Sequence, residues 1–134
     1  MTEEQLALVR YRLAQADESI IEARVLMNGS MSPRSIMNRL YYAMFYAVLA
    51  LLQEKRLGTS KHYGAISLFD REFVKHGVFE LDMSKTLHRA FELRQRGDYM
   101  EQHDVGEEDI AEIFPKAEYF VKRIRCRLLT DTPD

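Results

Sequence analysis

Apolar residues in the first part of the chain recur at alternating spacings of three and four positions. They are Leu6, Val9, Leu13, Ala16, Ile20, Ala23 and Met27. This period gathers apolar side chains on one stripe of an α-helix and favours packing against a nearly antiparallel neighbour. Thr2 and Gln5 have the spacing of a capping box at the start of this helix, and the turn-forming segment NGSMSP, which begins at Asn28, ends it.

A second helix is predicted from about Pro33 to Lys55, with Ser32 as its N-cap. Between positions 40 and 52 it is apolar on almost every side, so we expect it to be the central and most buried helix. Its tyrosines need polar partners for their hydroxyl groups, and we expect these groups to reach the bundle rim or polar side chains. They are Tyr41, Tyr42 and Tyr46.

A third helix is predicted over about residues 60–75. Its residues available for burial are Ile66, Phe69, Phe73 and Val74. A fourth helix is predicted from a capping Asp82 to about Arg96, and its inward stripe continues one turn later in Arg94. The apolar members of that stripe are Met83, Leu87 and Ala90.

Gly97 is expected to end the fourth helix, and Asp104 with Glu107 resembles the cap of a fifth helix that reaches about residue 129. No stretch of useful length alternates with the two-residue period of a β-strand. The pattern therefore predicts an all-α chain. We expect one domain over residues 1–130, followed by a loose tail at residues 131–134.

The composition is that of a globular domain with no strong overall charge. The chain of 134 residues is 46% apolar and 30% charged. Its 19 basic and 21 acidic residues give a net charge of -2, so any contact with RNA has to be local. One basic patch lies near the end, although a solvated helix face explains it more simply. Its residues are Lys122, Arg123, Arg125 and Arg127.

The compartment is indicated by three further observations. A single cysteine, Cys126, rules out an internal disulfide and suits a reducing environment. The N-terminal segment is acidic and polar, unlike a signal peptide. The longest apolar run, from Leu40 to Leu52, has 13 residues, short of the ~20 that a membrane-spanning helix needs. We therefore expect a soluble, cytoplasmic protein without a membrane partner.

Motifs for several common sites do not occur in the sequence. There is no glycine-rich phosphate loop, no HExxH and no CxxC, and the histidines lack the regular spacing of metal ligands. They are His62, His76, His88 and His103. We expect no metal and no cofactor, and we interpret His76 and His88 as ordinary surface or rim residues.

Two arginines lie beside apolar helix faces. Arg39 shares a face with Ile36 and Ala43, and Arg94 continues an inward stripe. Burying an unpaired guanidinium is very costly, so each arginine needs a partner. In one interpretation Asp98 pairs with one of the arginines and fixes the loop to the bundle, and in the other the arginines hold a phosphate.

Three segments and a final amphipathic helix resemble the HEPN domain in its small stand-alone prokaryotic form. The segments are SIMNRLYYAMFYAVLALL from Ser35, SKHYGAISLFDREFVKHGVF from Ser60 and LHRAFELRQRGDY from Leu87. They keep their order and spacing, and the resemblance covers about residues 5–128. It implies an antiparallel up-and-down bundle of about four long helices plus one shorter helix, often paired into a homodimer.

The resemblance also implies a class of function. Many HEPN proteins are metal-independent endoribonucleases, frequently encoded beside a minimal nucleotidyltransferase as a toxin and an antitoxin. Their signature is an arginine followed, after four to six residues, by a histidine. The histidine serves as acid or base at the RNA 2′-hydroxyl or the leaving oxygen, and the arginine holds the scissile phosphate.

The segment RQRGDYMEQH, residues 94–103, departs from this signature. Arg94 matches the family arginine, but Tyr99 stands in place of the nearest histidine of the signature, whereas Arg96 and His103 have the six-residue spacing. A branch of the family with Arg-x-x-x-Asp-Tyr resembles this segment better. It matches Arg94, Asp98 and Tyr99, and its SKH segment adds His62 to the candidates.

The candidate catalytic residues are therefore Arg94, Arg96, His103 and His62. The candidates for binding a phosphate or nucleotide are Arg39, Arg94, Asp98, Tyr99 and Tyr42. An antiparallel bundle can bring several of these together, although a capping or packing role also explains His62. Three functions stay open: an RNA-binding protein or metal-independent endoribonuclease of toxin–antitoxin type, a non-catalytic substrate- or nucleotide-binding partner of a minimal nucleotidyltransferase, and a structural association domain.

Overall fold

The computed structural model describes residues 1–59, 61–99 and 105–129, and for residues 96–99 it describes the backbone alone. The described elements are α1 (Glu3–Asn28), α2 (Pro33–Leu52), η1 (Gln53–Lys55), α3 (His62–Phe69), η2 (Asp70–Val74), α4 (Leu81–Tyr99) and α5 (Glu107–Leu128). Of the short elements, η1 is a 3-10 turn and η2 is a π-helical turn. No strand occurs within these ranges, so the all-α prediction is confirmed.

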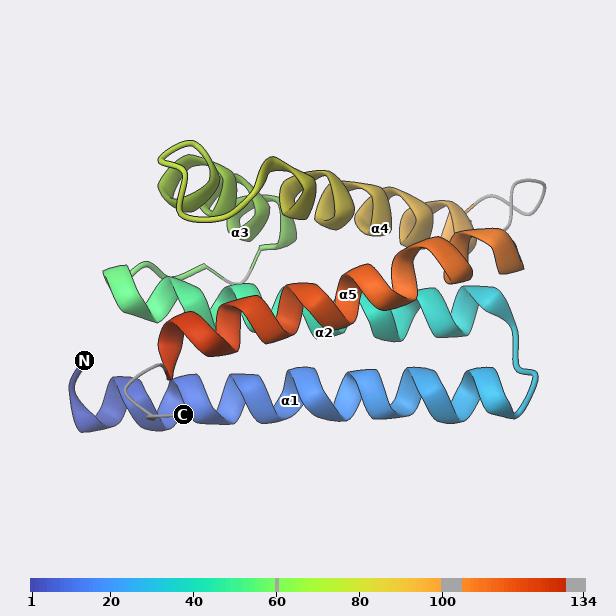
Figure 1. Ribbon diagram of the computed structural model, residues 1–134, viewed down its shortest axis with the longest axis horizontal. Coiled ribbons are helices and arrows are strands. Elements are labelled where there is room, and N and C mark those ends of the chain that lie inside the picture. The colour runs from blue at the N-terminus through green and yellow to red at the C-terminus, as the bar shows by residue number, and fades with distance from the viewer. Residues whose placement is uncertain (60, 100–104, 130–134) are drawn as a thin grey trace.

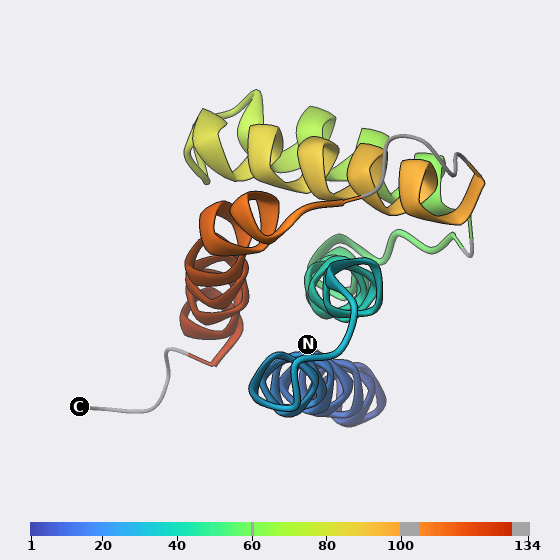
Figure 2. The same cartoon turned by 90° about the vertical axis from the view of Figure 1, so that its right-hand side faces the viewer.

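The helices run back and forth along the long axis of the molecule (Figure 1). Figure 2 shows α2 in the middle, with α1 on one side of it, α3 and α4 on the opposite side, and α5 alongside. The packing agrees with this view, because α2 contacts α1, α3, α4 and α5. The arrangement is the antiparallel helical bundle expected from the resemblance.

The predicted starts of the first two helices are confirmed in atomic detail. The backbone N–H of Gln5 donates to the Thr2 hydroxyl at 3.1 Å, and the Thr2 N–H donates to the Gln5 side chain at 2.9 Å. These two bonds form the capping box that begins α1. At α2 the Ser32 hydroxyl accepts from the N–H of Ser35 at 3.2 Å, and Pro33 occupies the first turn.

The core forms where the apolar stripes of the helices meet α2. The stripe of α1 is buried at Val9, Leu13, Ala16 and Ala23, but Met27 at its end is exposed. The segment Pro33–Lys55 is long and apolar enough to cross a membrane, and 67% of its apolar window is buried inside the bundle. The apolar side chains of this segment are therefore mostly packed against the other helices.

The boundaries of α4 and α5 differ from the predicted ones. Asp82 lies inside the first turn of α4 and does not cap it, and α4 continues through Gly97 to Tyr99. A single glycine costs a helix about 1 kcal/mol relative to alanine, which weakens the helix without ending it. At α5 the N-cap is Gly106, whose N–H donates to the Asp109 carboxylate at 2.9 Å. The other member of the predicted cap, Asp104, lies outside the described residues.

Candidate functional site

A buried tyrosine of the central helix contacts the first residue of α3. The hydroxyl oxygen of Tyr41 lies 2.7 Å from Nδ1 of His62. Tyr41 is 0% exposed, whereas His62 is half-buried. The contact gives the buried hydroxyl of Tyr41 a hydrogen-bond partner. It uses Nδ1 of His62 and leaves Nε2 available to a ligand.

Aromatic rings from two other positions hold the imidazole of His62 in place. The ring of Phe45, one turn beyond Tyr41 on α2, stacks on it at 4.3 Å between centroids with 9° between the planes. The ring of Phe91 on α4 lies 6.3 Å away. Since α2 and α4 both contribute, His62 is fixed by the packing of the bundle as well as by its own helix.

Electrostatics keep this pair of side chains neutral near pH 7. Burial lowers the pKa of His62 below its usual value of 6.5, and the positive charge of Arg94 lowers this pKa further. Burial also raises the pKa of the Tyr41 hydroxyl well above its usual range, although Arg94 acts in the opposite direction. The imidazole is therefore an uncharged acid–base group beside a fixed cation.

Arg94 reaches this place from the C-terminal part of α4. Its Nη2 donates to the Tyr42 hydroxyl at 3.4 Å, and its guanidinium carbon lies 5.2 Å from the centroid of the Tyr42 ring and 5.7 Å from that of Tyr41. The predicted continuation of the α4 stripe into Arg94 explains why a charged side chain is directed at these rings.

Arg39 approaches Tyr42 as well. Its guanidinium carbon lies 5.7 Å from the Tyr42 ring centroid. The same group donates to Glu22 on α1 at 3.1 Å and to Asn38 at 2.7 Å. Two guanidinium groups thus share one aromatic ring, which also lies 5.7 Å from the ring of His62. We call these residues the arginine–histidine cluster, which consists of Arg39, Tyr41, Tyr42, His62 and Arg94.

A hollow of about 450 Å³ adjoins the cluster on the first turns of α2. Its lining residues are Leu26, Arg34, Ser35, Asn38 and Arg39. Two cationic side chains, a hydroxyl and an amide here are the donors that a phosphate group accepts from. The hollow is therefore a second place at which an anion can approach Arg39, in competition with the Glu22 carboxylate.

The cluster unites several of the predicted site residues. Arg39, Tyr42, His62 and Arg94 lie together, as an antiparallel packing of the helices allowed. The remaining candidates fall outside what the structure describes: His103 is not among the described residues, and only the backbone is described for the other three. Those three are Arg96, Asp98 and Tyr99.

Little in the sequence indicates the residues that hold His62. The pattern identifies Tyr41 only as a tyrosine in need of a polar partner, and it does not distinguish Phe45 or Phe91 from other core residues. Aromatic residues on a buried helix are ordinary core residues by pattern, so the sequence contained no signal that their rings surround a histidine. The sequence also contains no signal that Glu22 and Asn38 are the hydrogen-bond partners of Arg39.

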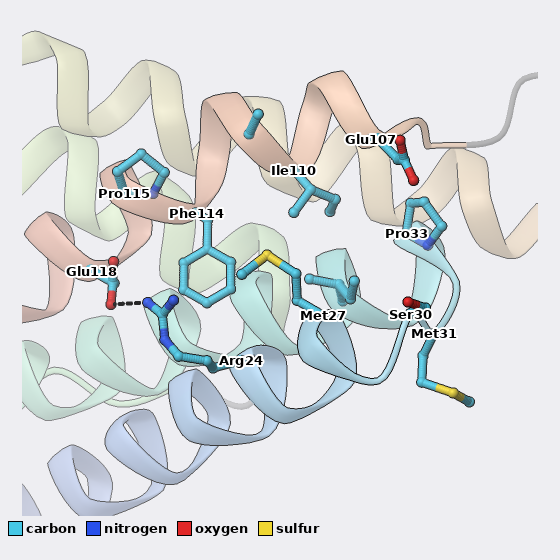
Figure 3. Close-up of a pocket in the computed structure, with 12 residues that line it drawn as sticks. Arg24, Met27, Ser30, Met31, Pro33, Glu107, Ile110, Phe114, Pro115 and Glu118 are labelled. Carbon is cyan, nitrogen blue, oxygen red and sulfur yellow. Dashed lines mark hydrogen bonds and ion pairs between the residues drawn. The ribbon is translucent and has the colours of Figure 1, made fainter.

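A groove of about 470 Å³ lies elsewhere, between the end of α1, the start of α2 and α5 (Figure 3). Met27 and Phe114 are among its apolar lining residues. Arg24 extends into the groove, with its guanidinium carbon 4.4 Å from the Phe114 ring centroid and its Nη2 2.7 Å from Glu118. The charge of Arg24 is compensated by the carboxylate of Glu118. The groove therefore offers apolar contacts more than it offers anion binding.

The basic patch of α5 is compensated in a similar way. Three of its arginines form ion pairs with acids from other parts of the chain. The pairs are Arg123–Glu80, Arg125–Asp17 and Arg127–Glu54. This compensation favours the interpretation of a solvated helix face over that of an RNA-binding patch.

His88 has an acidic partner on another element, which its spacing along the helix does not indicate. His88 is exposed, as predicted, but its Nε2 lies 2.7 Å from Asp70 of η2. The Ser84 hydroxyl donates to the other oxygen of Asp70 at 2.6 Å. These contacts join η2 to α4. Within the described ranges, no group of three or more His, Cys, Asp or Glu residues is placed to hold a metal ion.

Comparison with known proteins adds independent information. A family model described as the HEPN domain matches residues 9–127. A Thermotoga maritima protein named "UPF0332 protein" is 38% identical over 128 residues, which cover 96% of this chain and 96% of the relative. Two Methanocaldococcus jannaschii proteins are each named "Putative toxin". One is 34% identical and covers 84% of this chain and 83% of the relative, and the other is 27% identical and covers 88% and 80%.

Proposed function

The chain belongs to the HEPN domain family, and from this premise we propose that it is a toxin-type HEPN protein that binds RNA and cleaves it without a metal ion. The toxin names of the two Methanocaldococcus relatives support the biological class. The chemical class is supported by one structural observation. Arg39, Arg94 and the neutral imidazole of His62 meet around Tyr42.

This set of groups suits a phosphodiester. A guanidinium forms paired hydrogen bonds with phosphate oxygens, and it offsets the charge that they gain during the reaction. A neutral imidazole accepts a proton, and the lowered pKa keeps His62 in that form near neutral pH. RNA is the substrate class because its 2′-hydroxyl supplies an internal nucleophile that DNA lacks.

The reaction follows from these roles. Nε2 of His62 accepts the proton of the 2′-hydroxyl, and the 2′-oxygen attacks the adjacent phosphorus while Arg94 binds the non-bridging oxygens. The bond between phosphorus and the 5′-oxygen then breaks. One product ends in a 2′,3′-cyclic phosphate, and the other has a 5′-hydroxyl that takes its proton from solvent.

The test compares purified wild type with Arg94→Ala and His62→Gln on mixed RNA in EDTA. We expect the wild type to produce fragments with cyclic phosphate ends and each variant to lose about 100-fold or more in rate. His88→Gln is the matched control, because His88 is an exposed histidine paired with Asp70 in a different contact. Cleavage by the wild type that both cluster variants retain would contradict the assignment.

The other predicted pair needs the same assay. Arg96→Ala and His103→Ala remove the residues with the six-residue spacing of the family signature. Loss of cleavage in these variants, with Arg94→Ala and His62→Gln still active, would transfer the acid–base role to His103. The four variants together therefore decide which histidine acts.

A second function is favoured by the hollow beside Arg39. Its lining contains Arg34, Asn38 and Arg39 but not His62, so it offers phosphate binding without an acid–base group. A non-catalytic nucleotide-binding partner of a minimal nucleotidyltransferase would use such a hollow. Calorimetric binding of ATP that Arg34→Ala weakens, in a protein that leaves RNA intact, would select this function. The homodimer expected for the family stays a prediction, which light scattering on the purified protein tests.

A further inference from the structure

Tyr63 is a large aromatic residue that the structure leaves open at the edge of the arginine–histidine cluster. It follows His62 in the first turn of α3, and it is 66% exposed. An aromatic ring with this much free surface gains little from the core. Its exposed surface is therefore available for contact with something outside the chain.

The ring of Tyr63 is joined to the cluster through Phe91. The centroids of Tyr63 and Phe91 are 5.0 Å apart, with 75° between the ring planes. Phe91 is 7% exposed and lies 5.5 Å from Tyr41 and 6.3 Å from His62. Tyr63 is thus supported on one side by a buried ring, and Phe91 precedes Arg94 by one turn of α4.

We propose that Tyr63 is a base-stacking subsite that selects single-stranded RNA at the arginine–histidine cluster. The proposal rests on the proposed function and adds the side chain that contacts the base. A nucleotide whose phosphate is bound by Arg94 has its base one sugar away. The exposed ring of Tyr63, which contacts Phe91 beside the cluster, would receive a base near that phosphate. Every base has a face that stacks on tyrosine, so this subsite tolerates many sequences.

Base pairing is what the subsite excludes. A base in a duplex is covered by its neighbours, and it must leave the stack before it can lie on a protein side chain. Single-stranded RNA, loops and bulges have such bases available. Cleavage and binding are therefore directed to unpaired nucleotides, although the overall charge of the protein gives it no general attraction to nucleic acid.

The experiment measures binding to 2′-O-methyl oligonucleotides, which cannot form the cyclic phosphate and stay intact. The variants are Tyr63→Ala and Tyr63→Trp. We expect Tyr63→Ala to weaken binding of the single strand roughly 5- to 150-fold, the range for losing one stacked base, and Tyr63→Trp to retain it. Binding to the matching duplex should be weak in the wild type and unchanged in both variants.

Tyr11→Ala is the matched control. Tyr11 is 59% exposed, and it lies on α1, across α2 from α3 (Figure 2). The Tyr11→Ala variant should bind the single strand as tightly as the wild type does. Thermal unfolding followed by circular dichroism should be the same for both alanine variants, since neither removes a buried side chain.

A direct readout accompanies the affinities. The same oligonucleotides carrying 4-thiouridine should form a photo-crosslink that mass spectrometry assigns to Tyr63. Unchanged single-strand binding by Tyr63→Ala, combined with lost binding by Arg94→Ala, would overturn the stacking subsite and leave the proposed function standing. A wild type that binds neither single strand nor duplex would overturn both.

Discussion

Tyr41 and His62 connect the core of the bundle to its surface, with the tyrosine hydroxyl 2.7 Å from Nδ1 of the imidazole. One partner is fully buried and the other is half-buried. The imidazole is consequently held by a residue of the core, while its second nitrogen, Nε2, is left available to a ligand. This relationship, together with the charge of Arg94, leads to the first three predictions.

The pKa of His62 is expected to lie below 6.5, and Arg94→Gln is expected to raise it. Burial lowers this pKa, and the guanidinium charge adds to the effect, so removing the charge removes part of the shift. Titration of the imidazole resonances by NMR measures both values. An unchanged titration of His62 in Arg94→Gln would contradict this cause.

Stability should fall in acid because of His62. A histidine with a lowered folded-state pKa binds fewer protons in the native than in the unfolded protein, so its contribution is present above about pH 6.5 and is lost as the pH drops below that value. Urea unfolding of the wild type and of His62→Gln at pH 7.5 and pH 5 tests this. The decrease in the free energy of unfolding from pH 7.5 to pH 5 should be smaller in His62→Gln than in the wild type.

Tyr41→Phe isolates the hydrogen bond to His62. The ring packing is kept, whereas the bond is lost, which costs about 0.5–1.5 kcal/mol in the free energy of unfolding. Tyr46→Phe serves as the comparison, since no hydrogen bond within the described ranges involves the Tyr46 hydroxyl and the change should stay within about 0.5 kcal/mol. Equal effects in the two variants would show that the bond to His62 adds nothing.

Leu51→Ala tests the central position of α2. Leu51 is 0% exposed, and removing a fully buried leucine side chain costs about 2–5 kcal/mol because a cavity remains. Leu81→Ala makes the same chemical change at a residue that is 61% exposed, and its cost should be within about 0.5 kcal/mol. Chemical denaturation followed by circular dichroism measures the difference.

Gly77 is predicted to resist substitution for a backbone reason. Its φ of +77° lies in the left-handed region, and a Cβ there would meet no atom within 4 Å. Gly77→Ala should therefore cost about 1–2 kcal/mol through the backbone alone. Gly58→Ala, at a position with equally open surroundings and no left-handed φ, should be nearly neutral. A neutral Gly77→Ala would contradict the assignment of this cost to φ.

The helices could be predicted from the sequence because their signals are local. The stripe of α1 and the capping box of Thr2 and Gln5 depend on residues only a few positions apart, and both are confirmed. The prediction failed at Gly97, where a residue that disfavours helices lies inside α4. Local preference is weak there compared with the packing of the rest of the helix.

The candidate site was predictable only in part, because its contacts are distant in the chain. Arg39, His62 and Arg94 were selected by helix position and family resemblance, and their meeting around Tyr42 required the fold. The hydrogen bond between Tyr41 and His62 joins α2 to α3, and the one from Arg39 to Glu22 joins α2 to α1. No spacing along a helix determines such pairs.

The consecutive tyrosines of α2 also constrain how this protein can change. Tyr41 is enclosed in the core, while Tyr42 faces the two arginines, so one helix turn carries both stability and chemistry. Directed evolution of the proposed RNA binding should therefore accept few substitutions at Tyr41, since most of them destabilise the core before they alter recognition. Variation should accumulate at Tyr63, where the side chain is exposed and its removal is expected to leave the fold intact.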